Sequence, residues 1–175
     1  MQPIDTSLFK KALGHFTSGV TVMTVSKDGT DWGMTASAFC SLSLDPPLVL
    51  VCVKKGNTMW EMLQGSAGYA VSILNVDQEE WSNRFAGGLV DADGNWTPWP
   101  EDRSRFEGID FVRGEASGAA LLPGAIAQLD CIHESQLDGG DHTIFVGRVV
   151  GAVAAERGEG KPLIYQGGGY RSLKS

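Results

Sequence analysis

Long hydrophobic runs are absent from this 175-residue sequence. Its longest apolar stretch, residues 47–53, suits a buried strand and is far too short to span a bilayer. The opening residues, MQPIDTSLFKK, also lack the apolar segment of a secretion signal. We therefore expect a cytoplasmic protein with no membrane partner.

Positive charge is also scarce. Lysine and arginine total 14 against 21 aspartate and glutamate residues, which gives a formal net charge of −7. No local cluster of lysine or arginine offsets this balance, and an acidic surface repels a phosphate backbone. We therefore expect no nucleic-acid partner.

Cysteine and histidine are rare, with three of each. Cys40, Cys52 and Cys131 form no C-x-x-C pair and lie in apolar or strand-like segments, so we expect reduced, buried thiols. The histidines lie far apart in the sequence and show no ligand spacing, so we expect no metal site.

Several motifs of known enzyme classes are missing. The sequence has no G-x-x-x-x-G-K-[ST] phosphate loop and no well-placed G-x-G-x-x-G fingerprint. Residues 167–169, Gly-Gly-Gly, follow a possible strand but precede no helix, which predicts a turn. No G-x-S-x-G occurs, and the serines of 35–43 have no neighbouring base. This disfavours a hydrolase, although a triad assembled in space stays open.

What is present is typical of one folded domain. With 42% apolar and 20% charged residues, the chain can bury a core, and its length is too short for two ordinary domains. We expect a single domain over residues 1–175. The 23 glycines indicate many turns.

Three segments have the character of helices. The apolar residues of 5–16 recur at helical spacing, which predicts an amphipathic N-terminal helix. A short helix is predicted over 59–63, with Asn57 or Thr58 as its cap. A third is predicted over 77–85, with Asp77 as its cap.

The remaining periodic segments have the character of strands. A hairpin is predicted over 19–36, a buried strand over 48–53, a strand over 69–74, two long strands over 125–136 and 142–154, and a short strand over 163–165. Residues 87–108 show no period, and we predict a loop and candidate lid there.

Successive strands are joined mainly by turns, which predicts a mainly β fold: an antiparallel, barrel-like core with peripheral helices. A parallel doubly wound sheet ranks second, because regular β-α-β alternation fails over 19–54 and again over 125–154.

Two segments favour ligand binding. Residues 34–43 form a thin, strand-like segment of mostly small side chains, which would let a large group lie against the backbone. Residues 54–58, Lys-Lys-Gly-Asn-Thr, lie where a strand meets a helix, and their donors could seat an anion. The ordinary alternative is a solvated turn with an Asn or Thr cap.

The three histidines differ in context. His142 follows a turn and begins an apolar strand, so it is either a chemical group or the polar end of a hairpin. His133 alternates within a strand and is expected to be a surface or hydrogen-bonded histidine. His15 lies beside the apolar face of the first helix.

Taken in order, these segments resemble a known family over nearly the whole chain. The matching stretches are F-x-x-A-L-G-x-F-x-x-G-V-T-V from Phe9, G-M-T-A-S-A-F-x-S-L-S-x-D-P-P-L-V from Gly33, R-F-A-G from Arg84, G-D-H-T-I-F-V-G from Gly140 and G-G-Y ending at Tyr170. The sequence resembles the flavin reductases with the FMN-binding split-barrel fold, the reductase components of two-component flavin-dependent monooxygenases. It departs from the family pattern in 87–108, which is longer and richer in tryptophan.

The resemblance implies an antiparallel Greek-key split β-barrel and a set of site residues. The cofactor-binding set is Met34, Thr35, Ala36, Ser37, Ser41, Lys54, Asn57, Thr58, Arg84, Phe85 and Tyr170. Residues 34–39 would line the isoalloxazine ring, Ser41 and the 54–58 junction the ribityl and phosphate parts, and Arg84 the phosphate end. His142 and Tyr170 would lie on the nicotinamide side, with His142 positioning that ring.

The function implied is an NAD(P)H:flavin oxidoreductase that reduces FMN or FAD with NADH or NADPH and supplies a separate monooxygenase. The family also implies a homodimer with the flavin near the subunit interface. One alternative is a flavin-binding split-barrel protein without nicotinamide-dependent turnover. Another is a pyridoxal-phosphate-forming oxidase or a haem-related relative, for which the sequence shows no motif.

Overall fold

The computed structural model describes residues 4–156 and 158–173. Its main element is a single sheet of seven strands in which every neighbouring pair is antiparallel. In sheet order these are β3 (Thr30–Ala36), β2 (Thr21–Lys27), β6 (Gly68–Ile73), β11 (Ala127–Gly139), β12 (His142–Ala154), β5 (Pro47–Lys54) and β4 (Phe39–Leu44).

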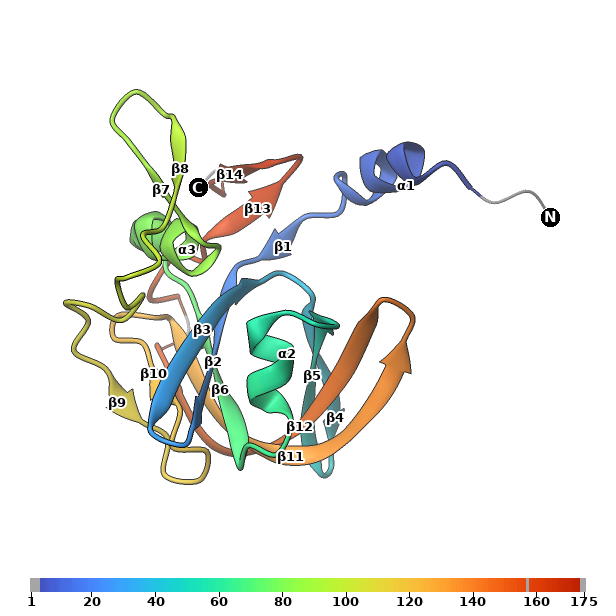
Figure 1. Cartoon of the computed structure of the whole chain (residues 1–175), viewed down its shortest axis with the longest axis vertical. Coiled ribbons are helices and arrows are strands. Elements are labelled where there is room, and N and C mark those ends of the chain that lie inside the picture. Colours follow the sequence, from blue (N-terminus) through green and yellow to red (C-terminus); the bar gives the residue numbers. More distant parts are fainter. Residues whose placement is uncertain (1–3, 157, 174–175) are drawn as a thin grey trace.

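The sheet curls into an open barrel, and α2 (Thr58–Leu63) lies across the opening between β3 and β5 (Figure 1). The β11–β12 hairpin shifts register twice, between Asp130 and Cys131 and between His133 and Ser135. Such irregularities bend a strand, which helps this long hairpin follow the curve. The mainly β, antiparallel architecture with peripheral helices is the one predicted.

Smaller elements surround the barrel. The remaining helices are α1 (Thr6–Leu13), the 3-10 turn η1 (Val76–Gln78) and α3 (Glu79–Phe85). The minor sheets are β1 (Ser18–Gly19) with β13 (Ile164–Gln166) and β14 (Gly169–Arg171), β7 (Gly88–Val90) with β8 (Trp96–Pro98), and β9 (Val112–Arg113) with β10 (Ala120–Leu121). No helix in the described ranges has the length and apolar character that crossing a bilayer requires.

Strand β2 is buried on both faces because it separates two hydrophobic clusters. Met23 and Val25 pack inside the barrel with Val51 and Phe145, whereas Val22 packs on the other face. That second cluster also holds Phe85 of α3, so the cluster fixes α3 against the sheet.

Several local predictions are confirmed by the structure. The β2–β3 hairpin turns at Asp28 and Gly29, with φ of 50° and 77°, the left-handed pair typical of a type I′ turn. The predicted strands at 48–53, 69–74 and 142–154 and the short helix after Asn57 are all present. Residues 167–168 form the turn between β13 and β14.

Other boundaries were wrong. The first helix ends at Leu13 instead of Phe16, with Gly14 at its C-terminal end, where glycine weakens continuation. Asp77 lies within η1 and is not its cap; the side chain of Gln78 instead accepts from the backbone of Asn75. Strand β11 runs on to Gly139, so its turn to β12 is shorter than predicted.

The segment 34–43, expected as one strand, divides at Ser37 and Ala38 into β3 and β4. Residues 87–108 are also not an irregular loop throughout, because β7 and β8 pair within them and Trp99 is buried. The cysteines are free as predicted, but only Cys131 is buried. Cys52 is half-buried, and Cys40 is exposed on the terminal strand β4.

Candidate functional site

Strand β3 is the centre of the predicted site. It is the terminal strand of the sheet and pairs only with β2, so the outer edge of its backbone faces no other strand of that sheet. Along this edge Met34 and Thr35 are half-buried, while Ser37 just beyond the strand is exposed. A planar ligand lying here would meet backbone groups and small side chains, as the sequence indicated.

The side chain of Ala36 faces the barrel core, and the residue is only 6% exposed. Its carbonyl accepts a hydrogen bond from the Thr21 hydroxyl at 2.7 Å. Ala36 therefore offers a ligand little surface of its own, and it holds β3 against β2.

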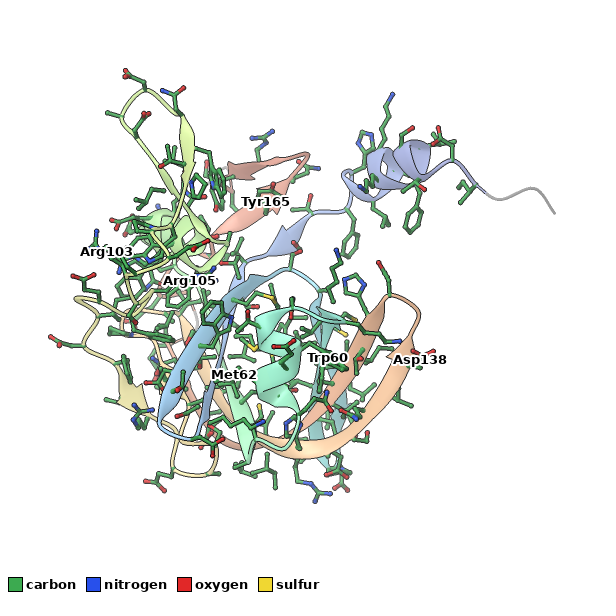
Figure 2. The ribbon with its side chains drawn as sticks, viewed as in Figure 1. Trp60, Met62, Arg103, Arg105, Asp138 and Tyr165 are labelled. Carbon is green, nitrogen blue, oxygen red and sulfur yellow. The ribbon has the colours of Figure 1, made fainter. Side chains whose placement is uncertain are left out.

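A cavity of about 440 Å³ lies at one end of β3, and three predicted residues, Thr35, Ser37 and Tyr170, line it together. Other lining residues come from α3, β7–β8 and β13–β14: Glu79, Ser82, Asn83, Ala86, Val90, Trp96, Tyr165, Gly168 and Gly169, with Val20. Figure 2 shows Tyr165 on β13 beside this region.

Hydrogen bonds through Ser82 join three walls of this first cavity. The Thr35 hydroxyl donates to the Ser82 carbonyl at 2.6 Å, and the Tyr170 hydroxyl lies 2.8 Å from Ser82 Oγ and 2.9 Å from Asn83 Oδ1. Burial is the main cause that raises the pKa of Tyr170, so its hydroxyl stays protonated. β3, α3 and β14 are thus held in fixed relative positions.

A second cavity, of about 800 Å³, lies beside the start of the same strand. Thr58 and the β3 residues Trp32 and Gly33 line it, together with residues 99–106. Because β3 runs from this cavity to the first, the predicted site residues on β3 lie between two open spaces.

The junction 54–58 is a capped turn whose donors are partly engaged. Asn57 Oδ1 accepts from the backbone of Trp60 at 2.8 Å, and Asn57 Nδ2 lies 3.8 Å from Met34 Sδ. Asn57 is therefore a helix cap, as in the ordinary alternative to an anion site that the sequence left open. The contact with Met34 also places this turn against β3. Lys54 and Thr58 are exposed at the two ends of the turn.

Arg84 does not face an open phosphate site in this structure. Its guanidinium donates to the Glu107 carbonyl at 2.8 Å, contacts Glu80 at 3.3 Å and lies 4.6 Å from the Trp99 ring centre. Arg84, predicted to contact the phosphate, thus holds residues 99–107 against α3 in this structure.

Phe85 has no exposed surface and lines neither cavity, so nothing in this structure supports the predicted flavin contact. Its ring packs edge-on against Phe106, with centroids 5.1 Å apart, and occupies the space above Gly33. The Phe85 ring thus packs against β3 at Gly33. Ser41 is exposed on β4, opposite Val49 of β5, and lines neither of the two cavities.

His142 begins β12 and pairs in register with Lys54 of β5. Its side chain is 42% exposed, and its Nδ1 lies 2.7 Å from Asp141 Oδ1, a contact that orients the ring. The same contact lowers the pKa of Asp141. His142 and Lys54 thus lie side by side at one end of the barrel, where β12 begins and β5 ends. His142 lines neither of the two cavities.

His133 is hydrogen-bonded rather than free, with Nε2 3.0 Å from Ser66 Oγ, as expected for a structural histidine.

Sequence reasoning missed several lining residues. Ser82 and Asn83 immediately precede the recognised Arg-Phe-Ala-Gly run on α3, and this adjacency was an available signal. Trp96 and Tyr165 reach the first cavity only because β8 and β13 fold back on α3, and no local pattern reveals that.

A flavin fits the residues present. Small side chains and an open strand edge could accept the ring, and Thr58 and Lys54 could meet the phosphate of the flavin. Arg105 lies on a wall of the second cavity and donates only to backbone carbonyls, so the site contains a positive group without a nearby carboxylate partner in the described chain.

Comparison with known proteins identifies the family of the chain. The chain matches the Flavin reductase like domain over residues 13–174. It is 39% identical over 171 residues to an NADH-dependent FAD reductase of Streptomyces globisporus, covering 98% of this chain and 87% of that protein. It is 39% identical over 165 residues to the reductase component of 4-hydroxyphenylacetate 3-monooxygenase of Thermus thermophilus, covering 94% and 95%.

A solved structure of the NADH:FAD oxidoreductase of Streptomyces globisporus, in complex with NAD and FAD fragments, superposes with a TM-score of 0.83 at 35% identity. The match covers 99% of this chain and 98% of that one. The predicted split-barrel fold is confirmed, and the chain belongs to the flavin reductase like domain family.

Proposed function

We propose that this chain is an NAD(P)H:flavin oxidoreductase that reduces FMN or FAD and supplies reduced flavin to a separate monooxygenase. The observation that carries the proposal is the run of small residues on terminal strand β3, held between two cavities of about 440 and 800 Å³. Relatives that are NADH-dependent FAD and FMN reductases support it.

The bound nicotinamide and flavin supply the hydride chemistry. The protein has to bring two rings into contact and exclude water from between them. Met34, Thr35 and Ser37 would form the surface on which the flavin ring lies. Thr58, Asn57 and Lys54 would meet its phosphate end, where an exposed amine and hydroxyl are at hand. No group is required to act as a general acid or base.

His142 and Tyr170 would position the nicotinamide. Contact with Asp141 fixes the His142 ring through Nδ1 and leaves Nε2 directed to other partners. Tyr170 is fixed by Ser82 and Asn83, so its ring can serve as a rigid wall. Both are positioning residues in this proposal.

A homodimer would complete the arrangement. Within one chain the proposed site residues fall into two groups. One group lies at the first cavity, and the other lies where Lys54 at the end of β5 pairs with His142 at the start of β12. Neither cavity includes His142. Helix α1 also projects away from the barrel (Figure 1), and within residues 4–156 and 158–173 none of the residues on its apolar face is buried. A second copy packed on α1 would cover this face.

Release of reduced flavin to a monooxygenase follows from the names of the relatives, several of which are reductase subunits of flavin-dependent monooxygenases. It requires moderate rather than tight flavin affinity. A cytoplasmic location also fits, because three unpaired thiols and a reduced nicotinamide substrate suit a reducing compartment.

The test is a steady-state assay of the purified protein with each pairing of FMN or FAD with NADH or NADPH. Loss of nicotinamide absorbance that depends on added flavin is the expected result. Flavin binding without nicotinamide oxidation would instead identify a flavin-binding protein on the same barrel, and the absence of both would reject the proposal.

A further inference from the structure

Arg105 differs in its pairing from the arginines around it. Arg103 contacts Glu107 at 2.7 Å, and Arg113 donates to both carboxylate oxygens of Asp31 at 2.8 and 2.9 Å. For Arg105, by contrast, no carboxylate of residues 4–156 or 158–173 lies within salt-bridge distance. Its positive charge is therefore uncompensated.

The guanidinium of Arg105 is nevertheless held rigidly. Its Nη1 donates to the Gly33 and Phe85 carbonyls, both at 3.1 Å. Its Cζ lies 4.6 Å from the centre of the Trp32 ring, so the guanidinium stacks on the indole. Figure 2 shows Arg105 beside β3, close to the loop that carries Arg103. A fixed, half-buried cation of this kind is costly unless an anion meets it.

The surroundings indicate which anion. Arg105 and Trp32 line the second cavity, and so does Thr58, a proposed contact for the flavin phosphate. The second cavity therefore adjoins the proposed position of the FMN phosphate. About 800 Å³ is ample for a further nucleotide, since small-ligand pockets span about 300–1,000 Å³.

We propose that this cavity binds the adenosine diphosphate half of FAD, with Arg105 contacting the diphosphate, so that the chain prefers FAD to FMN. The inference rests on the proposed function and adds to it the choice of flavin. Diphosphate oxygens match the planar fork of a guanidinium, and the Trp32–Arg105 stack gives an adenine ring a flat surface.

The acidic residues of the cavity do not cancel this charge. Asp31 is neutralised by Arg113, whose hydrogen bond lowers the pKa of Asp31. Glu101 and Asp102 lie exposed at the rim, where water and salt screen them more strongly than they screen the half-buried Arg105.

The test compares FAD and FMN binding to the full chain by isothermal titration, in the absence of nicotinamide. The wild-type protein should bind FAD more tightly than FMN, and ADP alone should compete with FAD and not with FMN. Arg105→Gln should weaken FAD binding about tenfold, the loss expected for one charge-assisted contact, and leave FMN binding nearly unchanged.

Arg103→Gln is the matched control, because it removes the same charge from the same segment where Glu107 already neutralises it. It should leave the FAD-to-FMN ratio unchanged. Arg105→Lys, which keeps the charge without the fork, should fall between wild type and Arg105→Gln. Thermal unfolding of each variant separates loss of folding from loss of affinity.

Equal affinity for the two flavins in all variants would overturn the inference while leaving the reductase function intact. An effect of Arg105→Gln on NADH binding alone would also overturn it, by assigning the cavity to the nucleotide of NADH. A protein that binds neither flavin would instead reject the proposed function itself.

Discussion

The phenolic oxygen of Tyr170 lies 2.8 Å from the hydroxyl oxygen of Ser82. Tyr170 is close to the end of the described chain, and Ser82 is on helix α3, so this contact ties the last hairpin to the wall of the first cavity. The Ser82 carbonyl also accepts from Thr35. A single serine therefore links the C-terminal hairpin to the strand that we expect to face the flavin.

Replacing Tyr170 by phenylalanine removes the hydroxyl and keeps the ring. Because Ser82 is fully buried and would lose a partner, Tyr170→Phe should lower the free energy of unfolding by about 1 kcal/mol. It should also raise KM for the nicotinamide nucleotide. Urea denaturation and steady-state kinetics measure the two effects. Tyr165→Phe, on the ring stacked edge-on against Tyr170, is the control and should change stability less.

Replacing His142 by alanine tests the nicotinamide side. His142→Ala should raise KM for NADH by up to about tenfold, the value of one lost hydrogen bond, with little change in flavin affinity. Asp141→Asn should have a smaller effect of the same kind, because it loosens the ring without removing it. Unaltered NADH kinetics in His142→Ala would return this residue to the role of ending a turn.

Gly33 lies directly beneath the ring of Phe85. A Cβ placed on Gly33 would lie 2.4 Å from the ring of Phe85, which is fully buried. Gly33→Ala should therefore cost about 1–3 kcal/mol of stability and displace β3, weakening flavin binding. Gly19→Ala is the control, since nothing lies within 4 Å of its added Cβ. Equal unfolding midpoints for the two variants would contradict this packing.

His133 should make stability depend on pH. Burial lowers the pKa of His133 below its usual 6.5, so the unfolded chain binds a proton that the folded chain does not. Stability should therefore fall as pH drops below about 6.5, and His133→Gln should flatten that decline. Denaturant midpoints measured across this range above the carboxylate pKa values test it. A decline of equal size in the variant would assign it to other groups.

The exposed face of α1 should govern assembly. Leu8, Phe9 and Leu13 are 57, 48 and 55% exposed, and no residue of α1 is buried. An exposed apolar helix face of this kind is typical of an interaction surface. The double change Phe9→Glu and Leu13→Glu should convert a dimer to monomer in analytical ultracentrifugation. Lys10→Glu, on the polar side of the same helix, should not. A wild-type monomer would refute the dimer proposal.

Sequence reasoning succeeded where the determining residues are neighbours in the chain. Asp28 and Gly29 specify their own turn, and Asn57 caps the helix that follows it. It failed where distant segments decide. Trp99 is buried, with the guanidinium groups of Arg84 and Arg103 4.6 and 5.2 Å from its ring centre, and nothing in the composition of 87–108 predicts that position.

The same distinction applies to the site. Small side chains after Gly33 predict a ligand-facing strand, and strand character and side-chain size are local properties. The structure places β3 at the end of the sheet with an unpaired outer edge. The engagement of Arg84 with the Glu107 carbonyl and the full burial of Phe85 depend on how residues 99–107 fold over α3. The resemblance to a family supplied residue roles, but it could not specify which of those side chains are already committed to neighbours.

The two-residue turn at Asp28 and Gly29 also bears on the order of assembly during synthesis. It lets β2 and β3 meet as soon as both leave the ribosome, whereas Lys54 meets His142 only after the chain between them has been closed into a loop. An isolated hairpin is only marginally stable, so β2 and β3 become stable only when β6 pairs with β2. Strand β3, which we propose faces the flavin, can therefore pair with β2 well before His142 pairs with Lys54.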